Sequence, residues 1–142
     1  MNIELTDKQF RLLMDIAYAG EHVINANREE TIKQYEDILQ LIYSKAKDFG
    51  CGDLVEYDKE DKMYYEMRKF EDSVINNFIE EYDTTTLYET LSFELAKRDY
   101  LNEIDDKNSD SEEERIGYIL DLQDEYLQEF EDSGVNNIYI RN

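Results

Sequence analysis

The chain contains no proline and only five glycines in 142 residues. Proline and glycine are the residues that most often interrupt helices, so long helices can form almost anywhere along this sequence. Apolar residues recur mainly at helical spacing, and no internal repeat or linker separates them. The sequence therefore predicts a single helical domain over residues 1–142, all-α in class, as a compact bundle of about five helices. A short two-stranded β element that pairs the N- and C-terminal segments is expected to join the termini.

The first helix is expected to begin after Thr6, because Thr6 and Gln9 have the spacing of a capping box. It then carries two neighbouring apolar stripes. The first contains Phe10, Leu13, Met14, Ala17 and Ile24, and the second contains Leu12, Ile16, Ala19 and Val23. A helix that is apolar around most of its girth is usually buried. We therefore expect this helix to lie at the centre of the bundle.

The second helix is expected to be capped by Asn27 and Glu30. Its apolar residues alternate in steps of three and four, which is typical of a helix that packs along another helix. They are Ile32, Tyr35, Leu39, Ile42, Ala46 and Phe49. Gly50 then stands where a left-handed glycine commonly ends a helix.

A third helix is predicted after the connection at residues 51–61. Its apolar positions are Met63, Met67, Phe70, Val74, Phe78 and Tyr82. The sequence Asp-Thr-Thr-Thr at residues 83–86 is expected to end this helix. Thr86 and Glu89 then form a second capping-box pattern, which predicts a fourth helix with Leu87, Leu91 and Leu95 that ends near Ile104.

A fifth helix is predicted between Ser111 and Gly134. Ser111 and Glu114 have capping-box spacing, and Glu112 to Glu114 would place negative charge in the first turn, where the helix dipole favours it. The apolar positions are Ile116, Ile119, Leu120, Leu127 and Phe130, with Tyr126 alongside. Beyond this helix, Ile138 and Ile140 alternate with polar residues. They are predicted to pair with Ile3 and Leu5 as the terminal β element.

The segment Asp105–Gly117 resembles a calcium-binding loop at first sight, because Asp106, Asn108 and Asp110 alternate. An EF-hand loop needs glycine at its sixth position and glutamate at its twelfth. Ser111 and Gly117 occupy these two positions. The sequence therefore favours a loop that leads into a helix, and no metal site is expected.

The residues that most catalytic sites need are scarce. His22 is the only histidine and Cys51 the only cysteine, so a zinc cluster or an intramolecular disulfide is excluded. No phosphate-binding glycine loop, signal peptide or membrane-spanning segment is recognisable. We therefore expect a cytoplasmic protein that is not an enzyme and needs no cofactor.

The net charge of −21 is the most informative feature for function. The charge grows along the chain, from −3 over residues 1–50 to −8 over 51–100 and −10 over 101–142. Such a field repels nucleic acids and anionic membranes and attracts basic proteins. The candidate binding residues are the acids expected on the outer faces of the third and fifth helices. They are Asp121, Asp124, Glu125, Glu129, Asp132, Glu71, Asp72, Glu80 and Glu81.

Two interpretations of this acidic surface remain open. In the first, the surface imitates the phosphate backbone of a nucleic acid and occupies the basic groove of a nucleic-acid-binding protein. In the second, the charge serves solubility only, and the protein is a bacterial adaptor or a homo-oligomer. The adaptor would bind through a rim rich in tyrosine, of which the chain has twelve.

Three segments resemble a group of small acidic bacterial proteins of unknown function. They are YAGEHVINANREETIKQYEDILQLIYSKAKDFG, LSFELAKRDYLNEI and EYLQEFEDSGVNNIYI. This resemblance implies a compact bacterial domain and carries no activity with it. In size, charge and expected helicity, the chain is also similar to anti-restriction and anti-CRISPR proteins that mimic DNA.

Overall fold

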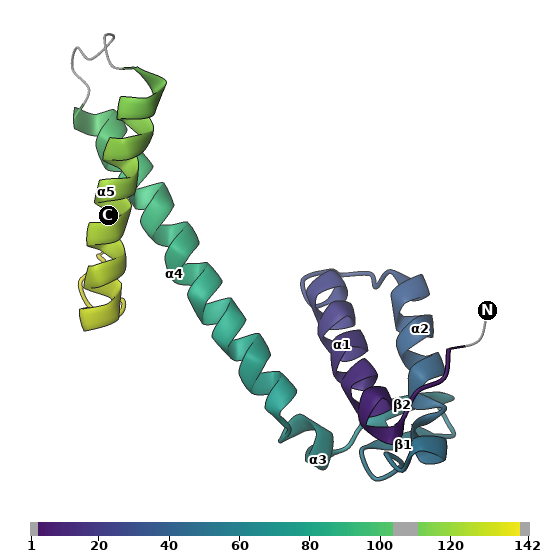
Figure 1. Cartoon of the computed structure of the whole chain (residues 1–142). Helices are drawn as coiled ribbons and strands as arrows, with labels where there is room; N and C mark the ends of the chain where they lie inside the picture. The colour runs from purple at the N-terminus through teal and green to yellow at the C-terminus, as the bar shows by residue number, and fades with distance from the viewer. Residues whose placement is uncertain (1–2, 104–110, 140–142) are drawn as a thin grey trace. The chain divides into compact units, whose positions relative to one another are not determined.

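The computed structural model describes residues 3–103 and 111–139. The chain is mainly helical, with five α-helices and one short antiparallel hairpin among these residues. It divides into two compact units, Met1–Glu80 (unit 1) and Glu81–Asn142 (unit 2). The helix α4 (Val74–Glu103) contributes its first residues to unit 1 and the rest to unit 2. Figure 1 labels the elements of both units.

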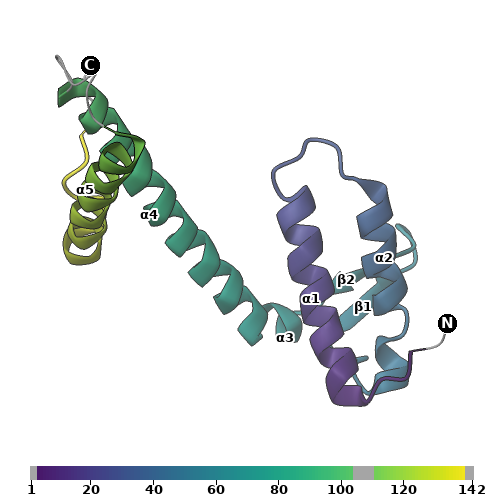
Figure 2. The same cartoon turned by 45° about the horizontal axis from the view of Figure 1, so that its top comes forward.

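Unit 1 begins with two helices, α1 (Asp7–Asn25) and α2 (Lys33–Tyr43), which pack side by side (Figures 1 and 2). A 3-10 helix η1 (Ala46–Phe49) follows, and then a hairpin of β1 (Val55–Asp58) and β2 (Met63–Glu66). The short helix α3 (Arg68–Glu71) leads to α4.

The N-terminus of α1 is as predicted. Thr6 accepts a hydrogen bond from the Gln9 amide, and the Gln9 side chain accepts one from the Thr6 amide, so the capping box is complete. The prediction that α1 is buried around most of its girth is wrong. Only the stripe with Phe10 and Met14 enters the core. In the second stripe, Leu12, Ile16 and Val23 lie in solvent, whereas Ala19 is half-buried and packs against the core, because the core residues of α2, the hairpin and α3 gather on the side of α1 that carries Phe10 and Met14.

The predicted start of α2 is also wrong. Its N-cap is Ile32, which makes no side-chain capping bond, rather than Asn27 or Glu30. The side chain of the buried Asn25, at the end of α1, accepts a hydrogen bond from the Ile32 amide at 2.8 Å. The amide at the start of α2 is therefore bound by a residue seven positions earlier rather than by a neighbouring cap. Gly50 has the predicted left-handed conformation, with φ of 69°, but it ends η1 rather than one long helix.

Residues 55–66 form a hairpin where a loop and the start of a third helix were predicted. Asp58 makes the turn, because its carboxylate accepts hydrogen bonds from the amides of Glu60 and Asp61 at 2.6 and 3.1 Å. Gln40 of α2 binds both backbone groups of Tyr64 in β2, at 2.9 and 2.6 Å. These bonds come from 24 residues away, and they stabilise an extended strand in a segment whose apolar spacing also fits a helix.

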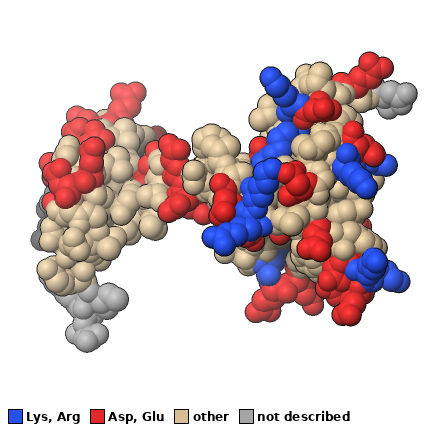
Figure 3. Space-filling model, turned by 90° about the horizontal axis from the view of Figure 1, so that it is seen from below, with Lys and Arg blue, Asp and Glu red and all other residues tan. Residues whose placement is uncertain are grey.

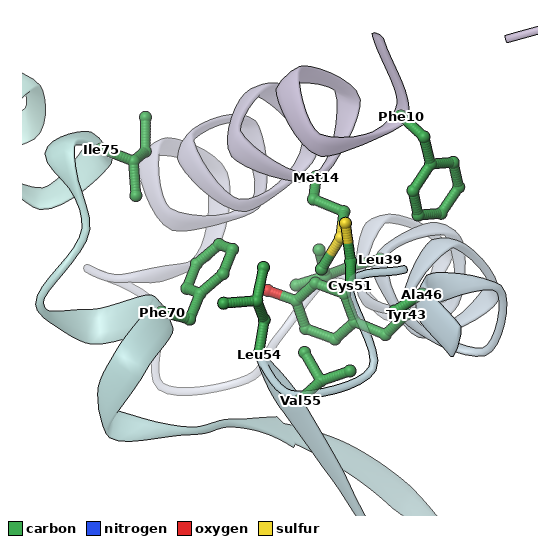
Figure 4. Packing of buried hydrophobic residues seen from close by; sticks show 10 residues of the cluster. All are labelled: Phe10, Met14, Leu39, Tyr43, Ala46, Cys51, Leu54, Val55, Phe70 and Ile75. Atoms are coloured by element: carbon green, nitrogen blue, oxygen red, sulfur yellow. The ribbon is translucent and has the colours of Figure 1, made fainter. Parts of the chain in front are cut away.

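The core of unit 1 collects side chains from α1, α2, the hairpin and α3. Tyr43, Phe70 and Met14 are almost completely buried. Figure 4 shows Tyr43 reaching into this cluster with its hydroxyl toward Phe70. The two rings are 6.1 Å apart in an edge arrangement, and Tyr18 packs against Phe70 in the same way at 5.1 Å. Because α3 carries Phe70, this short helix closes the core.

Helix α4 is continuous for 30 residues, so the predicted break at residues 83–86 is wrong. Threonine lowers helix stability by less than about 0.7 kcal/mol per residue relative to alanine. This is too little to interrupt a helix that has buried residues toward both of its ends, Ile75 on one side of the threonines and Ala96 and Tyr100 on the other. Thr86 and Glu89 therefore lie inside α4 and do not form a cap.

Unit 2 pairs α4 with α5 (Glu112–Ser133) as a helical hairpin (Figure 1). The capping box of Ser111 and Glu114 is complete, and α5 ends at Gly134, both as predicted. The pairing of the termini is wrong, because Ile3, Leu5 and Ile138 lie in no strand. Ile140 and the alternating acids of the calcium-loop pattern, Asp106 to Asp110, lie outside the described residues.

Candidate acidic binding surface

Five of the predicted binding residues lie on one helix of unit 2. They are Asp121, Asp124, Glu125, Glu129 and Asp132, and we call them the α5 acidic face. All five side chains are exposed, and the opposite side of α5 carries the buried Phe130. Asp121, Glu125 and Glu129 are spaced four residues apart, so their carboxylates follow one another at intervals of about 6 Å along the helix. The face is therefore a row of fixed negative charges that helix geometry holds in place.

The first turn of α5 extends this charge. Glu112, Glu113 and Glu114 are exposed at the N-terminus of the helix. The hydrogen bonds from the backbone and hydroxyl of Ser111 hold the pKa of Glu114 below its usual range. Glu114 is therefore ionised at neutral pH, and it serves the helix as a cap as well as adding to the field of the unit.

Few cations in unit 2 offset these carboxylates. Its described residues include fifteen acids and three bases, and two of the bases are already paired. The Lys97 ammonium lies 2.9 Å from Glu94, and Arg98 Nε lies 2.7 Å from Asp99. On the face drawn in Figure 3, unit 2 shows acidic side chains without basic ones, whereas unit 1 shows both. None of the described basic residues of unit 2 forms an ion pair with the α5 acidic face.

A hydrogen-bonded cluster ties α4 to α5 beside this face. Arg98 donates to the Tyr126 hydroxyl at 3.2 Å, and that hydroxyl donates to Asp99. The Arg98 guanidinium, with help from the Tyr126 hydroxyl, holds the pKa of Asp99 below its usual range. The hydrogen bond to Asp99 raises the pKa of Tyr126. This cluster was not predicted, although an Arg-Asp pair on one helix and a tyrosine beside the apolar face of the next are a pattern that could have indicated it.

Replacing Asp99 with asparagine should lower the stability of unit 2 by about 1 kcal/mol at pH 7, a value kept small because Arg98 is half exposed. Because the folded pKa of Asp99 is depressed, its contribution is present above the unfolded pKa of about 3.9 and is lost as the pH falls below it. Urea unfolding, monitored by hydrogen exchange of the amides in α4 and α5, should therefore show that unit 2 is more stable in the wild type than in the variant at pH 7. This difference in stability should shrink toward pH 2. Asp83→Asn, at an exposed position of α4, is the control. An equal loss of stability in both variants would contradict the stabilising role of Asp99.

A surface hollow of about 460 Å³ lies between the two helices of unit 2, beside the Tyr126 cluster. Its lining includes Glu125 and Glu129 of the α5 acidic face together with Asp99 and Asn102 of α4. Leu122 and Tyr126 form the apolar part of the lining. The acidic face is therefore not flat, and a basic side chain that enters this hollow can meet carboxylates from both helices.

The other four predicted binding residues lie elsewhere along the chain. Glu71 and Asp72 end α3, and Glu80 and Glu81 are exposed on α4. Asp72 pairs with Arg68 at 3.5 Å. Three of the four belong to unit 1 and only Glu81 belongs to unit 2. We therefore restrict the candidate site to the α5 acidic face.

The residues with metal-binding or nucleophilic chemistry take structural positions. His22 is half-buried, and its ring stacks on Tyr18 with the ring centroids 6.3 Å apart. Cys51 is buried in the core of unit 1, and this burial raises the pKa of its thiol. Among the described residues, no group of three or more His, Cys, Asp or Glu side chains could hold a metal ion. No helix in the same part of the chain is long and apolar enough to cross a membrane.

Comparison of the chain with protein-family models, with curated proteins and with solved structures found no match. The resemblance to small acidic bacterial proteins therefore remains an expectation from the sequence. The geometry and charge of the α5 acidic face are the features that bear on function.

Proposed function

We propose that this protein is a non-catalytic binding protein whose α5 acidic face docks on a basic protein surface. The observation that carries the proposal is the charge of unit 2, whose described residues include fifteen acids against three bases. Like charges four residues apart on a helix destabilise it by roughly 0.2–0.5 kcal/mol per pair. Asp121, Glu125 and Glu129 repel one another in this way, and no basic residue of α5 lies in the same row. A basic partner would offset it.

The partner class we favour is a nucleic-acid-binding protein with a basic groove. The row on α5 presents a carboxylate about every 6 Å, and a nucleic-acid strand presents a phosphate about every 3.4 Å along its axis. Both are rigid, regularly spaced lines of negative charge. The protein would then act as a nucleic-acid mimic, of the kind that inhibits restriction or CRISPR enzymes, and would compete with nucleic acid for the groove.

The test is a capture experiment with the full chain immobilised and bacterial lysate passed over it. The expected result is a basic nucleic-acid-binding protein that is held at low salt, released near 0.5 M salt, and displaced by duplex DNA. A variant with the α5 acidic face neutralised, as Asn for Asp and Gln for Glu at the five positions, should retain it at least about 10-fold less.

A matched control variant neutralises five exposed acids of unit 1, namely Glu29, Glu30, Asp37, Glu56 and Glu60. It removes the same total charge, so it should keep most of the retention if the α5 acidic face is the site. Equal losses in both variants would mean that net charge alone attracts the partner. Retention that is insensitive to salt and DNA would instead favour the adaptor interpretation, in which the charge serves solubility.

A further inference from the structure

The second apolar stripe of α1 is a surface feature that the acidic face does not explain. Leu12, Ile16 and Val23 are 61%, 68% and 67% exposed. Ala19 lies between them on the same stripe and is half-buried at the edge of the core of unit 1. The stripe lies on the opposite side of α1 from Phe10 and Met14, which enter the core of unit 1. Large aliphatic side chains in a continuous exposed row commonly mark an interaction surface.

The spacing of this stripe matches a helix-pairing seam. The steps from Leu12 to Ile16, Ala19 and Val23 are four, three and four residues, as at successive core positions of a coiled coil. The stripe is also symmetric about its midpoint between Ile16 and Ala19. An antiparallel copy of α1 would therefore place Leu12 against Val23 of the partner and Ile16 against Ala19 of the partner. Each contact pairs a larger side chain with a smaller one, so the stripe is complementary to itself.

Two small residues allow two helices to approach closely at this midpoint. Ala19 lies within the stripe, and Gly20 follows it at the edge. A Cβ atom added at Gly20 would meet no atom within 4 Å, so the space beside the helix is open. Nothing in unit 1 requires a glycine here, because its φ is not in the left-handed region.

The local charge favours a second copy of this chain as the occupant. The layer from Asp7 to Lys45, which includes α1 and α2, carries seven acids and five bases, a balance of −2. Residues 81–142 carry eighteen acids and five bases, a balance of −13. Two copies would meet with far less repulsion through the layer of α1 and α2 than through unit 2.

Helix α2 also has exposed apolar side chains. Tyr35, Ile38 and Leu41 are 49%, 55% and 58% exposed. A stable interface buries about 800 Å² on each partner, which is more than the four side chains of the α1 stripe expose. In the proposed interface, exposed apolar side chains of α2 would supply part of the remaining area.

We propose that this protein forms a two-fold symmetric homodimer through the outer face of α1, with the α1 helices of the two copies antiparallel and the stripe of Leu12, Ile16, Ala19 and Val23 at its centre. The two-fold axis passes beside the midpoint of the stripe, so that each copy contributes the same surface. The proposal is independent of the function of the α5 acidic face.

The first test is the mass of the full chain in analytical ultracentrifugation at physiological salt. The expected mass is twice the 17.0 kDa of one chain. Ile16→Asp and Val23→Asp should each raise the dimer dissociation constant about 100-fold or more, because each dimer would bury two unpaired carboxylates. Both side chains are exposed in unit 1, so the variants should retain the wild-type circular dichroism spectrum.

Leu87→Asp is the matched control, since it adds the same charge at a residue of α4 that is 56% exposed. It should leave the dimer intact. A wild-type monomer at all concentrations would overturn the proposal, and so would a dimer that survives Ile16→Asp or is lost equally in Leu87→Asp. In the monomer case, the stripe would be covered by another part of the same chain or by a different protein.

Crosslinking tests the antiparallel register. An equimolar mixture of Leu12→Cys and Val23→Cys copies should form an intermolecular disulfide on mild oxidation. Leu12→Cys alone should not, because the two substituted positions would lie about 16 Å apart along the paired helices, and a disulfide needs Cα atoms within about 7 Å. Wild-type protein controls for Cys51, which is buried. A disulfide in Leu12→Cys alone would show a parallel pairing and overturn the antiparallel arrangement.

Discussion

Replacing Phe70 with alanine should lower the free energy of unfolding of unit 1 by about 3–5 kcal/mol, the usual cost of removing a fully buried phenylalanine. Phe70 is 0% exposed and lies in edge contact with Tyr18 and Tyr43. The Arg11 guanidinium also packs over the Phe70 ring, 4.8 Å from its centre. Removal of the ring would leave a cavity and separate α3 from the two helices of the layer.

The measurement is urea unfolding combined with hydrogen exchange, which reports each unit separately. Exchange should accelerate in α1, α2 and the hairpin. Phe78→Ala is the matched control, because Phe78 is also in unit 1 but is 57% exposed, and it should cost less than about 1 kcal/mol. A similar cost for both variants would show that Phe70 does not hold this core together.

Replacing Phe130 with alanine should destabilise unit 2 by a similar amount, about 3–5 kcal/mol. Phe130 is 5% exposed, and its ring stacks with Tyr88 at 5.4 Å and with Tyr126 at 6.3 Å. It is the one fully buried side chain that the structure describes on α5. Loss of the ring should therefore separate the C-terminal half of α5 from α4, and amide exchange should accelerate in residues 112–133.

Leu120→Ala on the same helix is the control for Phe130→Ala, because Leu120 is 48% exposed. It should change exchange in α5 only slightly. Each unit has its own buried residues, so Phe130→Ala should leave the slow exchange of α1 and α2 largely intact. If Phe130→Ala and Phe70→Ala instead accelerated exchange throughout the chain, the two units would be a single cooperative structure.

The predictions that held depend on short stretches of sequence. The two complete capping boxes, at Thr6 with Gln9 and at Ser111 with Glu114, involve residues only three apart, so no distant contact is needed to form them. The left-handed conformation of Gly50 likewise follows from the residue itself. The exposed position of the five acids on α5 follows from helical periodicity opposite Phe130.

The predictions that failed concern segments in which distant residues determine the outcome. Met63 to Glu66 fit a helical apolar pattern, but Gln40 binds the backbone of Tyr64 and so stabilises a strand. The threonines at residues 84–86 favour a break only weakly, and packing at both ends of α4 outweighs that preference. Ile138 alternates with polar neighbours as a strand would, but no strand of the described chain offers it a partner.

In the candidate site, too, local features were predictable and contacts between distant residues were not. The position and sign of the carboxylates on α5 were predictable, because charge and helical spacing are local properties of the sequence. The cluster of Arg98, Asp99 and Tyr126 was not, since Arg98 and Tyr126 are 28 residues apart and meet only when α4 and α5 pair. That cluster places Asp99 beside Glu125 and Glu129 in the same hollow.

The sequence by itself determined that this chain is mainly helical, where α1 and α5 begin, where α5 ends, and that one face of α5 is acidic. These properties depend on residues within one or two helical turns of each other. Only the tertiary structure decided which of the two stripes of α1 is buried, because both are apolar and either could pack on a neighbour. Burial of Phe10 and Met14 against Tyr43 and Phe70 left Leu12, Ile16 and Val23 in solvent, and this choice exposes the surface through which we expect two copies to associate.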